Sequence, residues 1–227
     1  MNPKINKWFR GCFLAIFILS FAYSAKAHQP EIARTSPVVI KDPELSTTFY
    51  GELKGAPQIY TFETTADFNL YVNLLVPQSS NPNGIYNAQV YRTHNGQRDL
   101  FALLYGPGVE WTKWYEEFAG DWYLKGPEFK ALAPAGQYEI KVYNNNNQGK
   151  YVLAVGEKEV FGLKSVISAF TVLPVLKISF FHTSVFKLFT AKLGIIYWVA
   201  MVILAVAVLI IRAIVLRQPS CHPRVKS

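Results

Sequence analysis

Aromatic and acidic side chains gather in one short stretch of the chain, residues 110–123, and these residue types can bind a ligand. Three of the five tryptophans fall there, among tyrosine and acidic neighbours. Aromatic rings stack on the faces of sugars, and carboxylates accept hydrogen bonds from hydroxyl groups. The stretch therefore predicts a contact surface for a carbohydrate or a protein partner. The ligand-binding candidates are Trp111, Trp114, Tyr115, Glu116, Glu117, Asp121 and Trp122.

The same residues allow two other interpretations. The carboxylates of Glu116, Glu117 and Asp121 are oxygen ligands of the kind that Ca²⁺ prefers, although they lack the regular alternating spacing of an EF-hand loop. Alternatively, the aromatic rings close one end of a folded domain. In that case the carboxylates lie in solvent or pair with Lys113 and Lys125.

No part of the sequence specifies a catalytic centre. Glu116 and Glu117 are adjacent and diverge on a strand or turn, whereas glycoside hydrolysis needs two carboxyl groups that face one bond about 5 to 10 Å apart. The sequence has no G-x-S-x-G motif, no H-E-x-x-H motif and no phosphate-binding loop. We therefore expect a non-catalytic protein without a cofactor.

Histidine offers a weak metal hypothesis. If a signal peptide is removed after Ala27, the free amine and the imidazole of His28 together form a nitrogen chelate suited to Cu²⁺. A further ligand would be needed, and His94 is the only other histidine well inside the segment 28–160. The competing interpretation of His94 is a polar turn residue.

The elements that position these residues are predicted to be short β-strands. Apolar and polar residues alternate with a period of two over residues 45–157, with turn residues between the runs. Strands spaced in this way indicate a mainly β fold, an antiparallel β-sandwich of jelly-roll-like type. The clearest runs are 68–76, 138–143 and 151–155, and shorter ones are 49–53, 58–63, 87–92 and 100–105.

Turn residues mark the connections between these strands. Asn95-Gly96 predicts a two-residue hairpin, because both central positions of a type I′ turn need a positive φ. The run 144–149, Asn-Asn-Asn-Asn-Gln-Gly, predicts another hairpin loop. Gly106-Pro107-Gly108 precedes the tryptophan-rich stretch and Gly126-Pro127 follows it, so we expect a long structured loop between strands.

The segments 134–143 (PAGQYEIKVY) and 149–155 (GKYVLAV) resemble the closing hairpin of bacterial pre-peptidase C-terminal domains. The segment 51–62 and the following Phe68-Asn69-Leu70-Tyr71-Val72 resemble their opening strands, with Asn69 where these domains commonly have Asp. The resemblance implies a compact sandwich that serves as an accessory module of secreted or surface proteins. The layout of the whole chain resembles that of bacterial single-pass membrane proteins.

The acidic residues divide the chain. All 15 lie between Glu31 and Glu159, and the 11 basic residues of the segment 28–160 leave it with a net charge of −4. The remaining basic residues flank apolar stretches. We therefore attribute the net charge of +8 and the high pI to a membrane protein and not to nucleic-acid binding.

Both ends of the chain have the composition of membrane-targeting segments. Residues 1–27 contain a basic region, an apolar run and Ala25-Lys26-Ala27, and so predict a signal peptide. Residues 193–216 predict a transmembrane helix, because an uncharged run of this length matches a hydrocarbon core of about 30 Å. Residues 217–227 form a short basic tail that the signal peptide places in the cytoplasm.

Residues 161–192 predict a basic amphipathic helix next to the membrane, interrupted or kinked at Pro174. Such a helix is expected to lie in the membrane interface with its lysines near lipid phosphates. The alternatives are a helix packed on the sandwich, a helix packed on a second copy of the chain, and a second membrane span.

Together these observations predict a protein of the bacterial inner membrane that crosses it once, with the sandwich of residues 28–160 in the periplasm. The expected function is binding or scaffolding, with a protein of the envelope as partner and the lipid bilayer as anchor. Binding or processing of an envelope carbohydrate through residues 111–123 is the alternative, and copper handling through His28 is a minor one.

Overall fold

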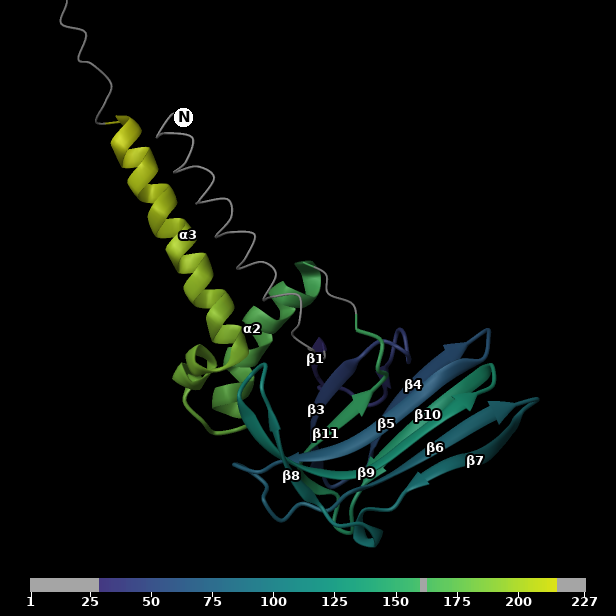
Figure 1. Ribbon diagram of the computed structural model, residues 1–227. Helices are drawn as coiled ribbons and strands as arrows, with labels where there is room; N and C mark the ends of the chain where they lie inside the picture. The colour runs from purple at the N-terminus through teal and green to yellow at the C-terminus, as the bar shows by residue number, and fades with distance from the viewer. Residues whose placement is uncertain (1–28, 160–162, 216–227) are drawn as a thin grey trace, which may run out of the picture. The chain divides into compact units, whose positions relative to one another are not determined.

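The computed structural model describes residues 29–159 and 163–215, and within them the chain forms two β-sheets that face each other (Figure 1). The six-stranded sheet has the order β1-β3-β11-β5-β9-β8, and the five-stranded sheet has the order β2-β4-β10-β6-β7. The predicted β-sandwich is confirmed. The strands are β1 (Gln29–Ile32), β2 (Val38–Val39), β3 (Thr47–Lys54), β4 (Gln58–Thr64), β5 (Phe68–Pro77), β6 (Asn87–His94), β7 (Gln97–Leu104), β8 (Thr112–Glu116), β9 (Asp121–Ala133), β10 (Gly136–Tyr143) and β11 (Gln148–Val155).

Most neighbouring strands are antiparallel, but two pairs are not. β1 pairs with β3 and β2 pairs with β4 in parallel. The alternation of side chains has the same period in both kinds of pair, so the sequence pattern does not reveal the direction of these two strands.

The core lies between the sheets and follows the predicted alternation. On β5, Phe68, Leu70 and Val72 point inward, and on β11 Tyr151 and Leu153 do so. The residues between them point to the outer face of the six-stranded sheet. Polar groups inside the core are paired: the hydroxyls of Tyr60 and Tyr151 lie 2.8 Å apart.

The two predicted hairpin turns are present. Asn95 and Gly96 have φ angles of 50° and 78° and connect β6 to β7 through the register pair His94 and Gln97. The loop between β10 and β11 likewise uses the left-handed region, with a φ of 49° at Asn147, and Gly149 near the start of β11 has a φ of 97°.

The prediction of a long loop between strands at 110–123 is wrong, because most of this stretch is the hairpin of β8 and β9. Trp114 pairs with Tyr123, and Glu116 pairs with Asp121. The turn forms because the carboxylate of Glu116 accepts hydrogen bonds of 2.7 Å from two backbone N–H groups of the turn, and because Gly120 supplies a φ of 73°. The Gly-Pro pair at 126–127 does not end β9.

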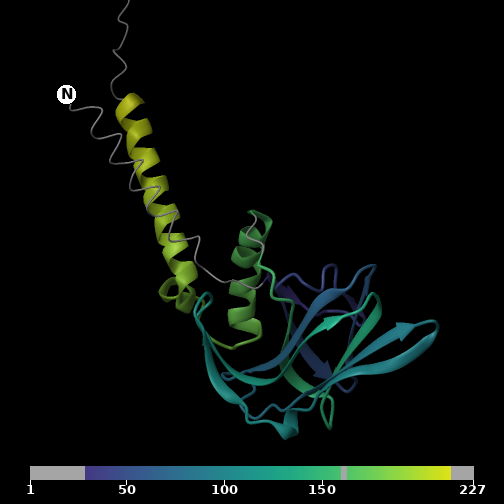
Figure 2. The ribbon, with the colours of Figure 1, turned by 45° about the vertical axis from the view of Figure 1, so that its right-hand side comes forward.

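An α-helix, α2 (Leu163–Ser179), lies beside β1 against the outer face of the six-stranded sheet (Figures 1 and 2). Its buried residues recur at three- and four-residue spacing: Ala169, Leu173 and Leu176, followed by Lys177. For residues 161–192 the sequence allowed a helix that packs on the sandwich, and the buried face of α2 agrees with that alternative.

Two expectations about this helix are corrected. The helix is not interrupted at Pro174: it continues to Ser179, and His182 beyond its end adopts a left-handed φ of 54°. Lys177 points into the protein and not toward lipid, because the carboxylate of Asp121 lies at 2.6 Å from its ammonium nitrogen.

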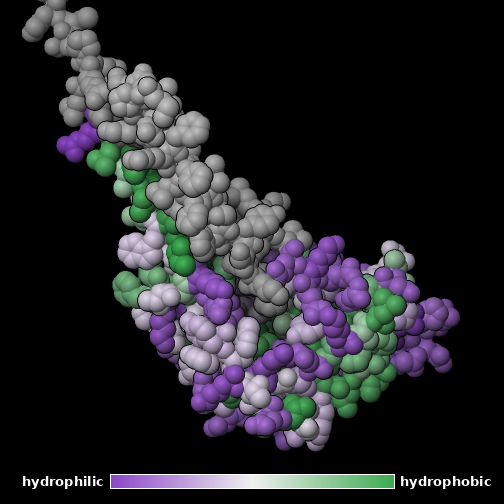
Figure 3. Space-filling model, in the orientation of Figure 1, coloured by the Kyte–Doolittle hydropathy of each residue, from purple (hydrophilic) through white to green (hydrophobic). Residues whose placement is uncertain are grey.

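Two 3-10 helices, η1 (Gly106–Gly108) and η2 (Val185–Thr190), and a second α-helix, α3 (Lys192–Val215), complete the described chain. Within that part of the chain, α3 is the one helix long and apolar enough to cross a membrane, with a mean hydropathy of 2.4 over Lys192–Leu209. Figure 3 shows its hydrophobic surface in green. The predicted signal peptide 1–27 and tail 217–227 lie outside the described residues.

Candidate functional site

A cavity of about 160 Å³ lies on the outer face of the six-stranded sheet, next to α2. Side chains of β1, β3, β5, β8, β9, β11 and α2 line it. Its wall combines aromatic rings with a few polar groups, which is the composition of a binding site. The residues that matter most for its chemistry are Tyr50, Asn73, Trp114, Glu116, Tyr123 and Lys125, which is the one basic residue among the described residues that line the cavity.

The hairpin of β8 and β9 supplies one side of this cavity, because its two faces differ. Trp114, Glu116 and Tyr123 are on the face that lines the cavity. Tyr115 and Trp122 are on the opposite face, where their ring centroids lie 4.9 Å apart and the side chains are 39% and 52% exposed. The structure therefore separates the sequence-predicted residues into two surfaces.

Trp111 belongs to neither surface. Its indole ring lies against Gly126, where an added Cβ would come within 2.5 Å of the ring, and its Nε1–H donates to the carbonyl of Gly106 at 3.0 Å. It packs against the core. Trp111 thus packs within the fold and is not among the residues that line the cavity.

The carboxyl group of Glu116 lines the cavity and is held in one orientation. Each of its oxygens accepts one backbone hydrogen bond, from Phe118 and from Ala119. Burial raises the pKa of Glu116, although both hydrogen bonds and Lys177 act in the opposite direction. A carboxylate oxygen can accept more than one hydrogen bond, so Glu116 retains capacity for a ligand.

Two of the tyrosines that line the cavity contact each other through their hydroxyl groups. The hydroxyls of Tyr50 and Tyr123 lie 3.2 Å apart, and burial raises the pKa of both well above the ordinary value of 10.0. Both hydroxyls are therefore protonated near neutral pH. One proton serves their mutual hydrogen bond, and the other can be donated elsewhere.

A buried ion pair, Lys177 with Asp121, lies close enough to Glu116 to affect its pKa. The ammonium of Lys177 lies 2.6 Å from Asp121, and both side chains are at least 96% buried. The same ammonium donates to the carbonyl of Gly120 at 3.3 Å. Burial raises the pKa of Asp121 and lowers that of Lys177, each against the attraction of the other.

Asp121 is thus a structural contact of α2 and not an exposed ligand-binding residue. Its second oxygen, Oδ2, has no hydrogen-bond partner among the described residues. The sequence analysis missed Lys177, although one signal was available: Lys177 falls four residues after Leu173, on the apolar side of the helix.

A second lysine holds the end of α2. The ammonium of Lys150 on β11 donates to the carbonyls of Ser179 and Phe180 at 2.8 and 2.9 Å, and it lies 2.9 Å from Nε2 of His182. A cation at the C-terminus of a helix stabilises its dipole. α2 is therefore fixed to the sheet by one ammonium group at its buried face and another at its end.

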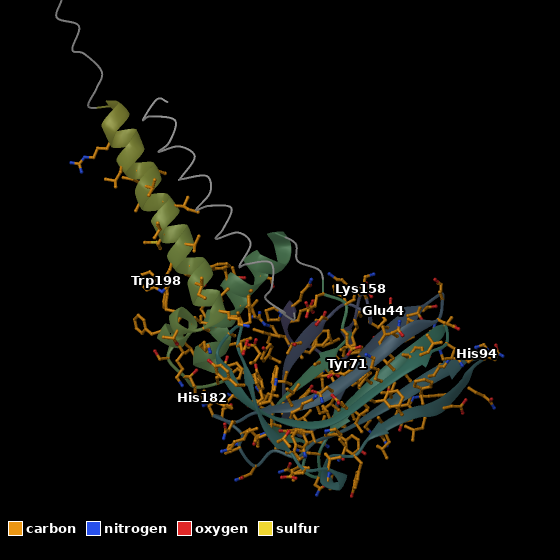
Figure 4. All side chains as sticks on the ribbon, viewed as in Figure 1. Glu44, Tyr71, His94, Lys158, His182 and Trp198 are labelled. Carbon is orange, nitrogen blue, oxygen red and sulfur yellow. The ribbon has the colours of Figure 1, made fainter. Side chains whose placement is uncertain are left out.

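Other expected pairs and metal ligands are not brought together. Lys125 pairs with Glu128 at 2.7 Å and not with the acids of the hairpin. Among the described residues no three His, Cys, Asp or Glu side chains gather into a metal site. His94 is at the tip of the β6–β7 hairpin, far from His182 (Figure 4), and His28 lies outside the described residues.

The geometry supports binding more directly than catalysis. Among the described residues that line the cavity, Glu116 is the only acid, so the paired carboxylates of a glycosidase are not in place there. The alternative interpretation of Glu116, Glu117 and Asp121 as Ca²⁺ ligands is not supported, because these acids do not gather into a metal site in the described part of the chain.

No protein-family model matches the chain, and no curated protein matches it in sequence. Among solved structures, it is similar to the pre-peptidase C-terminal domain of a collagenase from Bacillus anthracis, with 21% identity, a TM-score of 0.36, and coverage of 54% of this chain and 97% of that domain.

A surface-associated copper-binding protein important in copper acquisition by Methylomicrobium album BG8 matches with 10% identity and a TM-score of 0.29, over 56% of this chain and 100% of that chain. A β-glucosidase from Paenibacillus barengoltzii matches with 10% identity and a TM-score of 0.22, over 56% of this chain and 13% of the enzyme. The first match is to the domain class that the sequence motifs resemble, and TM-scores this low assign neither a ligand nor an activity to this chain.

Proposed function

We propose that this chain is a membrane-anchored, non-catalytic binding module, and that the cavity beside α2 receives a group from a protein partner in the bacterial envelope. One observation carries the proposal: the layer between the sheet and α2 contains a cavity with a fixed carboxylate and aromatic walls, next to a sandwich core that is tightly packed. Protein interiors are close-packed and contain few voids larger than a water molecule. A cavity of this size therefore supports a role in binding.

The size of the cavity favours a protein partner over a larger ligand. Pockets for small molecules and cofactors typically measure about 300 to 1,000 Å³. A cavity of about 160 Å³ is close to the volume that accepts a single benzene ring. It therefore fits one side chain, and side chains that fill pockets of the other protein dominate the energy of many interfaces.

The proposed location rests on both ends of the chain. α3 is long and apolar enough to cross a membrane. A signal peptide at residues 1–27 would export the segment that follows it and leave residues 217–227 in the cytoplasm. The sandwich would then act in the periplasm, with the lipid bilayer as its anchor.

The experiment is site-specific photocrosslinking of the full chain in intact cells. A photoreactive amino acid replaces Trp114 at the cavity or, in a matched variant, Leu132 on the exposed part of β9. The proposal predicts a discrete crosslinked protein from position 114 and none from position 132. The absence of any position-specific protein adduct at 114 would contradict it.

A second candidate function uses the other face of the hairpin. The exposed rings of Tyr115 and Trp122 are tilted by 44° to each other, and exposed aromatic faces of this kind are suited to sugar rings. Binding of envelope glycans by the full chain, lost in Trp122→Ala and retained in Trp114→Ala, would favour this alternative. Equal binding by both variants would remove the hairpin from consideration.

A further inference from the structure

The acidic and basic groups that line the cavity already have partners within the fold. Among the described residues, one acid and one base line it, Glu116 and Lys125. The oxygens of Glu116 accept hydrogen bonds of 2.7 Å from the N–H groups of Phe118 and Ala119. The ammonium of Lys125 lies 2.7 Å from the carboxylate of Glu128. Neither group therefore needs a ligand of opposite charge, and a charged ligand would be desolvated without a free counterion.

The uncharged polar groups of the cavity wall are also engaged by the protein. The amide nitrogen of Asn73 donates to the carbonyls of Gly126 and Pro127 at 3.4 and 3.2 Å. The hydroxyls of Tyr50 and Tyr123 share one hydrogen bond at 3.2 Å. The remaining tyrosine proton suits the face of an aromatic ring, which carries the negative part of the ring's quadrupole.

The rest of the wall is aromatic and aliphatic. The rings of Trp114 and Tyr123 have centroids 5.8 Å apart and planes at 41°, and Phe118 adds a third ring. Leu75 of β5 and Leu173 of α2 supply branched aliphatic surface. Aromatic side chains attract one another beyond the burial of their area when their centroids lie about 4.5 to 7 Å apart. A wall of this kind therefore favours an aromatic ring.

The volume of the cavity limits the size of that ring. It measures about 160 Å³, and an apolar cavity of about 150 Å³ accepts one benzene molecule. The two-ring system of indole is larger than this space. A much smaller group would leave the walls without packing partners, which forfeits dispersion contacts.

We propose that the cavity is a receptor for an uncharged phenyl ring, supplied by a phenylalanine side chain of the protein partner. This inference rests on the proposed function and specifies the ligand for the same site. It combines the paired charges, the aromatic wall and the volume of a single ring.

The test uses the full chain in nanodiscs of phosphatidylglycerol, titrated with the N-acetyl methylamide of phenylalanine and followed by saturation-transfer NMR. We expect a dissociation constant on the order of 1 mM, as for a fragment-sized ligand. The cyclohexylalanine compound, which has a ring without π electrons, is expected to bind about threefold more weakly. The lysine and glutamate compounds should bind at least about tenfold more weakly. Equal binding of the cyclohexyl compound or of either charged compound would overturn the proposal.

Two tryptophans on opposite faces of the β8–β9 hairpin identify the site. Trp114→Leu is expected to weaken binding of the phenylalanine compound about fivefold. Trp122→Leu is the matched control and should bind as the parent does, because Trp122 does not line the cavity. The two side chains are 38% and 52% exposed, so both variants are expected to fold. Any uptake of the compound by the bilayer is the same in both samples, and equal binding by the two variants would contradict the proposal.

Two leucines of α2 test the size of the site. Leu173→Ala widens the cavity and is expected to bind the two-ring naphthylalanine compound at least about tenfold more tightly than the parent does. Leu176→Ala is the same substitution at a buried leucine that does not line the cavity, and it should not gain this binding. A gain in both variants, or in neither, would sink the assignment. If the alanine variants do not fold, the tryptophan pair decides the question.

The absence of charge recognition has its own test. Lys125→Met removes the basic residue from the cavity wall together with its surface ion pair, and the affinity for the phenylalanine compound should stay within about twofold. A loss of more than about tenfold would mean that Lys125 recognises the ligand, and the proposal of an uncharged ring would fall.

Two further outcomes separate this inference from the function on which it rests. If a partner crosslinks at position 114 and the phenylalanine compound does not compete with it, the binding module stands and the phenyl-ring receptor is wrong. If the compound binds and Trp114→Leu weakens it while no protein crosslinks, the ring site stands and its occupant is a free aromatic compound, so the proposal of a partner's phenylalanine falls.

Discussion

The two buried layers of this protein, the interior of the sandwich and the layer between the six-stranded sheet and α2, are built from different chemistry. Leu70 in the interior and Lys177 in the outer layer are both 0% exposed. The interior is apolar and close-packed, with paired tyrosine hydroxyls. The outer layer contains an ion pair, a fixed carboxylate and a cavity.

This difference shows that burial has two consequences. In the interior it removes apolar surface from water, which stabilises the fold in proportion to the area. In the outer layer it also desolvates charges, and pairing only offsets that cost. The outer layer therefore contributes less to stability for the area it buries, but it fixes where α2 lies and places Glu116 at a cavity. The following predictions test this contrast by unfolding the full chain in detergent micelles.

The largest effect is expected from Lys177→Met. It leaves Asp121 and Glu116 without the ammonium that they share, and breaking a buried ion pair in this way costs about 3 to 5 kcal/mol of unfolding free energy. Replacing Asp121 with Leu in the same chain should recover at least half of that loss. A double variant no more stable than Lys177→Met would mean that the layer is held by packing and not by charge.

Leu153→Ala should cost about 3 kcal/mol, because it leaves a space in the interior that the neighbouring strands cannot fill. The same chemical denaturation measures it. No second substitution of a charged residue should restore the stability lost in Leu153→Ala. In Lys177→Met, by contrast, replacing Asp121 with Leu is expected to restore part of it. A loss below about 1 kcal/mol would indicate an interior that repacks and would weaken the contrast between the layers.

Lys150→Met is expected to lower the unfolding free energy by about 1 kcal/mol, since the carbonyls at the end of α2 lose their cation. Hydrogen exchange should localise the change to the last turn of α2. Lys141→Met on β10 of the other sheet serves as the control and should stay within about 0.5 kcal/mol of the parent. Equal effects of the two substitutions would show that α2 does not depend on Lys150.

The smallest effect is a difference in pH dependence. Burial raises the pKa of Glu116 above its ordinary value of 4.5, so the folded state binds more protons than the unfolded state just above that pH. The contribution of Glu116 to stability is therefore most favourable on the acid side and declines as the pH rises through its folded pKa. Between pH 7 and 4.5, the parent should gain stability relative to Glu116→Gln, and a parallel pair of curves would contradict the assignment.

Much of the sandwich could be predicted from the sequence, because it depends on local rules. The alternation along 68–76 and 151–155 determines which side chains face the core, and Asn95-Gly96 supplies the positive φ angles of its turn. The parallel partners of β1 and β2 could not be predicted, because alternation carries no information about strand direction.

Some of the residues that line the cavity belong to the stretch that the sequence singles out, but the element that carries them differs from the expected one. The tryptophan-rich stretch does supply Trp114 and Glu116 to the cavity, but as a hairpin and not as a long loop. Its strand pairing determines that Trp122 faces the other way and that Trp111 packs against Gly126.

The sequence by itself determined the β-sandwich, its inward-facing residues, and a C-terminal helix long and apolar enough to cross a membrane, because periodicity, turn chemistry and hydropathy act over neighbouring residues. Only the tertiary structure decided that Lys177 binds Asp121 and that Glu116 faces a cavity. Lys177 is 57 positions from Gly120 along the chain, yet its ammonium contacts that residue, and such contacts exist only after α2 has packed on the sheet.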